Sequence, residues 1–275
     1  MNNLNNNINK VTNLENNGFV IFQSFLDKFE VNLLYKAVYF QCLKKGSKEN
    51  YFSINYNSIL NKFFSLKFKK AIHHLNILKI INKKKLKDIS ELYFKQKSKL
   101  HTVDGYISEI SDNSVIPWHC DKAYSEKTTI NDIKKFVNPK STLLKFFIYL
   151  TDVGPGNGCT SYIPKSHKIA DIIRKGIYSN EIIFSPHWSL EQFKSFISIK
   201  KNYDFIREKL KNKNEIDEFI LKIKDLKNNE NSNFDFFAKA GDMIVFDEGG
   251  IHRGSPTTKS SRVVLRVNYR RQNIE

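Results

Sequence analysis

Two side chains in the segment Trp118-His119-Cys120-Asp121 are of types that bind metal ions. Successive side chains of a strand alternate between its faces, so His119 and Asp121 point one way and Cys120 points the other. An imidazole and a carboxylate on one face of a rigid strand can hold adjacent positions on a metal ion. Alternation also turns Trp118 away from this pair, so we expect its ring to belong to the hydrophobic core.

A third metal-ligand candidate is His252, in the segment GDMIVFDEGGIHRGSP (241–256). This segment predicts a strand, a Gly-Gly turn and a further strand that opens at His252. Two histidines and one carboxylate leave three metal positions open, which is the arrangement of non-haem Fe(II) oxygenases. Zinc is the alternative metal, although catalytic zinc sites commonly keep only one position open.

Arginine is scarce in the chain and is concentrated near its end. Lysine and arginine together number 45, but only seven residues are arginine, and five of these fall within residues 253–275: Arg253, Arg262, Arg266, Arg270 and Arg271. In SRVVLRVNYR (261–270), strand alternation places Arg262 and Arg266 on the same polar face. Because a guanidinium fork grips a carboxylate at two points, the cluster indicates a partner for a carboxylate-bearing molecule.

From about residue 100 onward, short apolar runs are bounded by glycine, proline, asparagine and aspartate. The runs are VDGYISEI (103–110), SVIPWHCD (114–121), TLLKFFIYLTDV (142–153), CTSYIPKS (159–166), FDFFAKA (234–240), DMIVFDEG (242–249) and SRVVLRVNYR (261–270). Many short strands separated by turn signals predict a β-sandwich or a barrel.

The remaining segments have other patterns. Residues 1–15 are rich in asparagine and predict a flexible arm. Residues 17–27 predict a turn, a short strand and a helix start that is capped by Asp27. Apolar residues at three- and four-residue spacing predict supporting helices within residues 28–100 and a helical insertion between two strands at residues 168–232.

Five stretches of the sequence resemble the phytanoyl-CoA dioxygenase-like branch of the Fe(II)/2-oxoglutarate-dependent oxygenases. They are NLENNGFVIFQSFLD (13–27), IPWHCD (116–121), NGCTSYIPKSHK (157–168), GDMIVFDEGGIHRGSP (241–256) and SSRVVLRVNYR (260–270). The resemblance implies one domain over residues 1–275, mainly β with helices. Its core would be a double-stranded β-helix, the cupin-like jelly roll, with N-terminal helices on one side and residues 168–232 as a lid over the active-site mouth.

The resemblance also implies a metal centre and a reaction. His119, Asp121 and His252 would bind Fe(II), and the enzyme would use 2-oxoglutarate and O2 to hydroxylate an unactivated C–H bond of a small molecule. Succinate and CO2 would be released. Asp121 disfavours halogenation, because halogenating relatives have glycine or alanine in place of this carboxylate.

The same resemblance implies the residues that would hold the cosubstrate. Arg262 would pair with the far carboxylate of 2-oxoglutarate, and Arg266 is the alternative because it lies on the same strand face. Ser255, three residues after the distal histidine, is a further candidate for that carboxylate. Phe147 is expected to line the cosubstrate pocket, with core packing as the alternative.

Composition limits the remaining functions. With 40% hydrophobic and 13% aromatic residues, the chain can build a core. It has no run of about 18 apolar residues for a membrane span and no apolar segment in MNNLNNNINK for a secretory signal. Three cysteines are too few for a disulfide framework, and we expect a cytoplasmic protein.

The net charge of +17 leaves two alternatives to the enzyme. A basic nucleic-acid-binding protein would explain the charge, but the excess is lysine, which rises together with asparagine in low-GC genomes. A catalytically inactive jelly-roll binding protein is the other alternative. The charge mildly favours an anionic small-molecule substrate. A homodimer through the helical insertion is an alternative use of that segment, because LEQFKSFISI (190–199) carries several bulky apolar groups.

Overall fold

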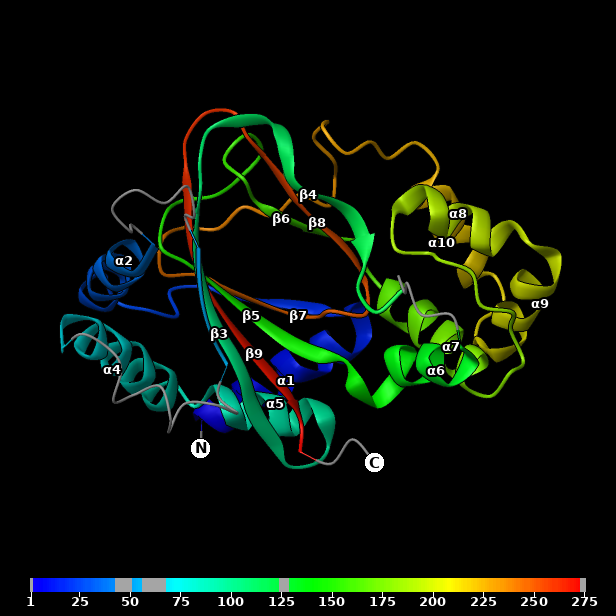
Figure 1. The fold of residues 1–275 in the computed structure, drawn as a ribbon, viewed down its shortest axis with the longest axis horizontal. Helices are drawn as coiled ribbons and strands as arrows, with labels where there is room; N and C mark the ends of the chain where they lie inside the picture. The colour runs from blue at the N-terminus through cyan, green and yellow to red at the C-terminus, as the bar shows by residue number, and fades with distance from the viewer. Residues whose placement is uncertain (1, 43–50, 56–67, 124–128, 273–275) are drawn as a thin grey trace.

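The computed structural model describes residues 2–42, 51–55, 68–123 and 129–272, which form two antiparallel sheets and the helices around them (Figure 1). The strands are β1 (Phe19–Phe22), β2 (Tyr51–Asn55), β3 (Ser98–Ser108), β4 (Ser111–Cys120), β5 (Leu143–Tyr149), β6 (Thr160–Tyr162), β7 (Met243–Asp247), β8 (Ile251–Thr257) and β9 (Arg262–Arg271). The larger sheet has the order β1-β7-β5-β9-β3-β2, and the smaller has the order β4-β8-β6.

The chain passes from one sheet to the other at almost every step. β3, β5, β7 and β9 belong to the larger sheet, whereas the strands that follow the first three of them, β4, β6 and β8, belong to the smaller. This alternation is that of a jelly roll, so the predicted double-stranded β-helix with helices is confirmed.

The larger sheet is apolar on both faces, and period-2 alternation assigns each side chain to one of them. On β5, Leu144, Phe146 and Ile148 belong to a core on the outer face. Phe147 and Tyr149 belong to a second core inside the roll. Lys145 is on the same inward face as these two rings, which places a charged group inside the roll.

Four helices cover the outer face of the larger sheet (Figure 1). They are α1 (Asn2–Asn17), α2 (Lys28–Cys42), α4 (Phe68–Lys83) and α5 (Leu86–Phe94). The supporting helices predicted within residues 28–100 are therefore present, although β2 interrupts them at the edge of the sheet. The parts of this prediction at residues 43–50 and 56–67 lie outside the described residues.

The N-terminal segment differs from its prediction. Residues 1–15 were expected to be a flexible arm, but α1 begins at Asn2, and its Val11 and Leu14 are buried in the outer core. These two residues, one helical turn apart, are enough to dock the helix. The abundance of asparagine, a weak helix former, conceals them in the sequence.

The predicted cap of the next helix is confirmed. The Glu30 N–H donates to Asp27 Oδ1 at 2.8 Å, and the Asp27 N–H donates to Glu30 Oε2 at 3.1 Å. The two residues therefore form a reciprocal capping box at the start of α2.

The insertion predicted at residues 168–232 is helical and has its own core. It contains α7 (Ser166–Tyr178), α8 (Leu190–Ser198), α9 (Lys200–Lys209) and α10 (Glu215–Ile223), beside α6 (Ile130–Val137) (Figure 1). Its apolar side chains pack against Trp118, Cys120 and Ile251 of the smaller sheet. The bulky residues of LEQFKSFISI that suggested a dimer surface are used here, since Leu190, Phe193, Phe196 and Ile197 are buried.

One predicted strand is replaced by isolated bridges. In FDFFAKA (234–240), Asp235 bridges to Ser161 and Ala238 bridges to Val153, but no continuous ladder forms. Asp235 makes a buried ion pair with Arg253 at 2.9 Å. This side-chain contact anchors the segment in addition to its few backbone hydrogen bonds, such as the one from the Phe236 N–H to the Thr160 carbonyl at 3.1 Å.

Candidate active site

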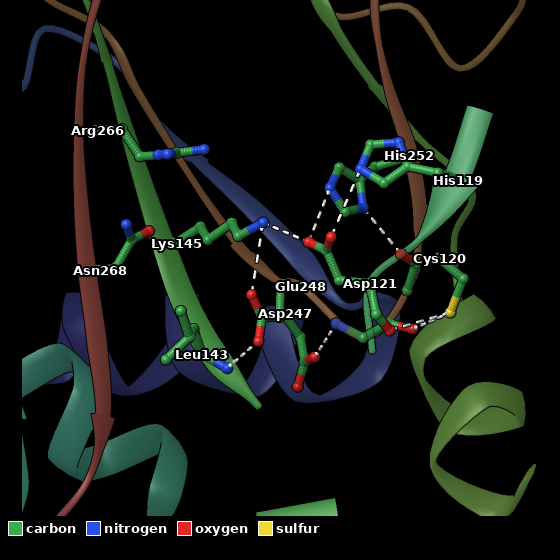
Figure 2. Close-up of polar contacts among 12 residues, drawn as sticks. His119, Cys120, Asp121, Leu143, Lys145, Asp247, Glu248, His252, Arg266 and Asn268 are labelled. Carbon is green, nitrogen blue, oxygen red and sulfur yellow. Dashed lines mark hydrogen bonds and ion pairs between the residues drawn. The ribbon is translucent and has the colours of Figure 1, made fainter. Parts of the chain in front are cut away.

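Strand register brings the two predicted histidine ligands together. β4 and β8 pair antiparallel, and His119 and His252 are direct partners in that register. Their ring centroids lie 4.2 Å apart. Asp121 follows the last residue of β4, and its carboxylate turns toward both rings (Figure 2). His119 and His252, which are 133 positions apart in the chain, therefore become neighbours because of one strand pairing.

The side chains between the ligands point the other way, as alternation predicts. The Cys120 thiol donates to the Gly249 carbonyl at 3.1 Å, behind the site. Trp118 is buried in the core of the insertion, where the Arg253 guanidinium lies 4.8 Å from its ring centroid.

The three candidate ligands have the geometry of a metal site. His119 Nε2 lies 3.7 Å from Asp121 Oδ1, and His252 Nε2 lies 3.6 Å from Asp121 Oδ2. One ligand atom from each of the three residues lies within 4.8 Å of the others. Each is a common ligand of divalent transition metals, so the donor set fits Fe(II).

Backbone carbonyls determine which nitrogen each imidazole presents. His119 Nδ1 lies 2.7 Å from the Pro117 carbonyl oxygen, and His252 Nδ1 lies 2.9 Å from the Gly250 carbonyl oxygen. A carbonyl only accepts hydrogen bonds, so we place the proton on Nδ1 in both rings. The Nε2 lone pairs then face each other and the carboxylate, as metal ligation requires.

Electrostatics keep the triad in its metal-binding protonation state. Burial lowers the pKa of His119, and burial together with the neighbouring His119 lowers that of His252 well below its usual value. Burial acts to raise the pKa of Asp121, but the Lys145 ammonium and the two imidazoles outweigh it and hold this pKa well below its usual range. Two neutral imidazoles and one carboxylate are therefore present at neutral pH.

Lys145 and Glu248 belong to this site, although no sequence motif indicated them. The Lys145 ammonium donates to Asp121 Oδ2 and lies 3.5 Å from Glu248 Oε2 (Figure 2). Glu248 also accepts a hydrogen bond from the Leu143 N–H at 2.8 Å. The available signal was a single lysine within the apolar run TLLKFFIYL, on the same strand face as Phe147.

The helical insertion reaches the metal ligands. The Cys120 N–H donates to the Trp188 carbonyl at 2.8 Å, and the Trp188 ring centroid lies 5.2 Å from that of His119. Trp188 is therefore a further residue of the site, and it comes from the segment just before α8.

A cavity of about 390 Å³ opens between the sheets beside the triad. The predicted residues among its lining are His119, Asp121, Phe147, His252, Arg262 and Arg266. Lys145, Tyr106 and Thr160 also line it. Its volume falls within the range that holds a small-molecule ligand.

The two arginines of this cavity differ in their partners. Arg262 Nη1 donates to the Gly158 carbonyl at 2.5 Å, and its Nη2 donates to Ser108 Oγ at 3.2 Å. Its Nε is buried and has no hydrogen-bond partner among the described residues. Arg266 is held by Asp104, whose Oδ2 lies 2.8 Å from both Nε and Nη2. The unsatisfied Nε of Arg262 fits the cosubstrate carboxylate that was predicted for it.

Ser255 does not reach the cavity. It is fully buried, and its hydroxyl donates to the Cys159 carbonyl at 2.9 Å. The prediction that Ser255 contacts the cosubstrate is therefore not supported. The physical reason is the alternation of β8: Ser255 lies three residues after His252 and thus on the opposite face.

Comparison with known proteins supports the fold. Among solved structures, the chain is similar to AviO1 from Streptomyces viridochromogenes Tue57, with 12% identity and a TM-score of 0.55 over 96% of this chain and 94% of that chain. It is similar to SnoK, a non-heme alpha ketoglutarate dependent carbocyclase from nogalamycin biosynthesis, with 15% identity and a TM-score of 0.54 over 96% and 83% of the chains.

HygX from Streptomyces hygroscopicus, solved with nickel and 2-oxoglutarate, has 12% identity and a TM-score of 0.54 over 96% of this chain and 87% of its own. At these identities the likeness shows a shared fold. No curated protein sequence matches the chain. The family model described as phytanoyl-CoA dioxygenase (PhyH) matches residues 14–264, and the chain therefore belongs to the phytanoyl-CoA dioxygenase family.

Proposed function

We propose that the chain is a non-haem Fe(II)/2-oxoglutarate-dependent dioxygenase that hydroxylates a C–H bond of a small, anionic substrate. The observation that carries this proposal is the assembly of His119, Asp121 and His252 around one point at the edge of a lined cavity. Bound Fe(II) with 2-oxoglutarate and O2 would supply the oxidising power, with release of succinate and CO2.

The residues of the chain would bind and orient the reactants. The two Nε2 atoms and the Asp121 carboxylate would hold the metal on one side, which leaves its other side open to the cavity. Arg262 would donate to the far carboxylate of 2-oxoglutarate through the Nε that has no described partner. Phe147 would pack against the carbon chain between the two carboxylates, since it lines the same cavity.

The surroundings of the triad would exclude water and fix the ligands. Phe246 lies 5.0 Å from the His252 ring, and Trp188 covers His119. We propose that the insertion at residues 168–232 acts as the lid of the active site, because Trp188 and the hydrogen bond at Cys120 attach it directly to β4.

A screen for succinate formation tests the proposed reaction. The purified protein would be incubated with Fe(II), 2-oxoglutarate and candidate substrates, starting with carboxylated and phosphorylated small molecules. We expect at least one substrate to raise succinate release in the wild type and not in His252→Ala. If the product formed from the substrate lacks a new hydroxyl group although succinate is released, the oxygenase chemistry would be supported and hydroxylation contradicted. Equal succinate release from the wild type and His252→Ala would contradict both the oxygenase chemistry and the hydroxylation.

A further inference from the structure

A second cavity, of about 420 Å³, lies between α5, α7 and the end of β9. It shares no lining residue with the active-site cavity. Asp247, which lines it, comes just before Glu248, and its carboxylate points away from the metal triad (Figure 2). The two cavities therefore lie on opposite sides of the turn that leads into β8.

The second cavity carries an excess of positive charge. Six basic residues line it: Lys95, Lys140, Lys168, Arg174, Lys175 and Arg271. Three acidic residues face them, and two of these are already paired, Glu15 with Lys95 at 2.9 Å and Asp171 with Lys175 at 2.6 Å. The third, Asp247, accepts hydrogen bonds from the Tyr93 hydroxyl at 2.6 Å and the Gly249 N–H at 2.7 Å. The net charge of the lining is +3 at neutral pH.

Arg174 is a buried basic residue in the lining of this cavity. It is only 2% exposed. Its Nε has no hydrogen-bond partner in the part of the chain that the structure describes. Arginine does not lose its proton in proteins, so it cannot relieve burial by becoming neutral. A buried guanidinium with an unsatisfied donor, in the lining of a cavity, favours the binding of an acceptor group there.

We propose that this second cavity binds the phosphate group of a small metabolite. A guanidinium fork and surrounding lysines suit a tetrahedral dianion, and the net positive charge of the lining matches its charge. The cavity is larger than a phosphate ion alone requires, which favours a phosphate monoester over inorganic phosphate.

The bound phosphate would also brace the metal site. A Cβ atom placed on Gly249 would lie 2.3 Å from Arg174 Nη2, so the guanidinium packs directly against this turn. Gly249 in turn accepts the hydrogen bond of Cys120, which lies between His119 and Asp121. A ligand that fixes Arg174 would thus restrain the segment that positions the iron ligands.

Calorimetric titration of the metal-free chain tests the proposal. Inorganic phosphate and an alkyl phosphate monoester would be titrated at constant ionic strength, with sodium chloride as the reference salt. We expect saturable binding, with the monoester bound more tightly. Arg174→Lys loses the fork and should weaken binding about tenfold, and Lys168→Ala should weaken it about threefold. Lys200→Ala serves as the matched control, because the side chain of Lys200 is 89% exposed on α9 and pairs with Asp204.

Three results would overturn the proposal. One is a heat of phosphate titration no larger than that of the reference salt, which would show that the cavity does not bind phosphate. Another is equal affinity in the wild type, Arg174→Lys and Lys168→Ala. The third is competition with 2-oxoglutarate together with loss of binding in Arg262→Lys, which would place the phosphate in the active-site cavity. Should Arg174→Lys fail to unfold cooperatively, Lys168→Ala against Lys200→Ala decides the outcome. Since no metal is needed, the result is independent of the proposed oxygenase reaction.

Discussion

The Lys145 ammonium lies between the carboxylates of Asp121 and Glu248, and both carboxylates are largely enclosed by protein. Burial acts to lower the pKa of Lys145, but the two carboxylates outweigh burial and raise it. A single cation thus compensates two acidic groups in the metal-free site. Burial raises the pKa of the Glu248 carboxyl, because little solvent reaches it, and the Lys145 charge opposes this rise.

Lys145→Met should therefore destabilise the metal-free protein, by about 3 kcal/mol, because one partner of a buried pair is removed. A divalent metal would then restore more stability in the variant than in the wild type, since it supplies the missing positive charge. Thermal unfolding with and without Mn(II) would measure both effects. Lys200→Met is the matched control at an exposed site. Equal metal-induced shifts in Lys145→Met and the wild type would contradict this role.

Arg262→Lys keeps the charge of the proposed cosubstrate arginine but removes its fork. We expect the 2-oxoglutarate concentration for half-maximal succinate release to rise, by about tenfold or more, because a two-point contact becomes a single one. Arg266→Lys is the comparison, since Asp104 already engages that guanidinium. Unchanged succinate release from Arg262→Lys at limiting 2-oxoglutarate would assign the role to Arg266.

The sequence predicts the residues of the triad better than it predicts their surroundings. His119 and Asp121 share a strand face, and that relation follows from the two-residue alternation of strand side chains alone. The partners of Lys145 and Glu248 depend on which strands lie side by side in three dimensions. Ser255 was chosen for its closeness to His252 in the chain, but its strand face turns it away.

At the scale of elements, the turn between β7 and β8 determines where His252 lies. Gly250 is packed so closely that an added Cβ would lie 1.9 Å from the Tyr162 hydroxyl oxygen. That hydroxyl donates to the Asp247 carbonyl at 3.0 Å, so it cannot move without breaking a buried contact. The same turn rests on Arg174 through Gly249.

Gly250→Ala should destabilise the protein by about 1–3 kcal/mol through overpacking and should weaken metal binding, because the turn carries His252. Chemical denaturation and a Co(II) titration would measure the two effects. Gly154→Ala is a suitable control, since its added Cβ would meet only Phe237, which is 75% exposed. Wild-type metal affinity in Gly250→Ala would show that the turn does not position the ligand.

The cap of α2 gives a prediction on pH dependence. Burial acts to raise the pKa of Glu30, but the Lys83 and Lys84 ammonium groups and the Asp27 N–H lower it from 4.5 to about 2. Because the pKa is lower in the folded state, its contribution to stability is complete above pH 4.5 and is lost as the pH falls toward 2. We expect Glu30→Gln to cost about 1–3 kcal/mol at pH 7.

Urea unfolding of the wild type and Glu30→Gln from pH 7 down to pH 2 would measure this contribution. The difference between their free energies of unfolding should shrink below pH 4.5. A difference that stays constant over this range would show that the charge of Glu30 contributes nothing. Glu191→Gln is a comparison at a carboxylate whose side chain is 77% exposed.

The elements that the sequence predicts well are those with a regular apolar period. The run TLLKFFIYLTDV forms β5, and the three- and four-residue spacing of the insertion forms helices. The exceptions depend on tertiary contacts. α1 is held by two buried residues in an asparagine-rich segment. FDFFAKA forms isolated bridges in place of a continuous strand ladder, and the ion pair between Asp235 and Arg253 helps to anchor it.

In the whole molecule, 45 basic side chains outnumber 28 acidic ones, and some of them form ion pairs at the surface. Exposed pairs such as Lys200 with Asp204 on α9 contribute little to stability. No helix among those that the structure describes combines the length and the apolar character needed to cross a bilayer. The cytoplasmic location and the absence of nucleic-acid binding stay predictions.

The homodimer through the insertion also stays a prediction. The bulky residues that suggested it are buried within the insertion, whereas Ile183, Ile199 and Leu221 are exposed on its surface. We expect a dimer through this segment to use exposed apolar residues such as these.

An anaerobic titration with Fe(II) and 2-oxoglutarate, followed by visible absorption, tests the metal site most directly. Chelation of ferrous iron by 2-oxoglutarate gives a charge-transfer band only when both are held in one site. We expect a band that saturates at one iron per chain and is absent in Asp121→Ala and His252→Ala, with Lys200→Ala unchanged. No saturable band in the folded wild type, or an undiminished band in both ligand variants, would contradict the proposed metal site.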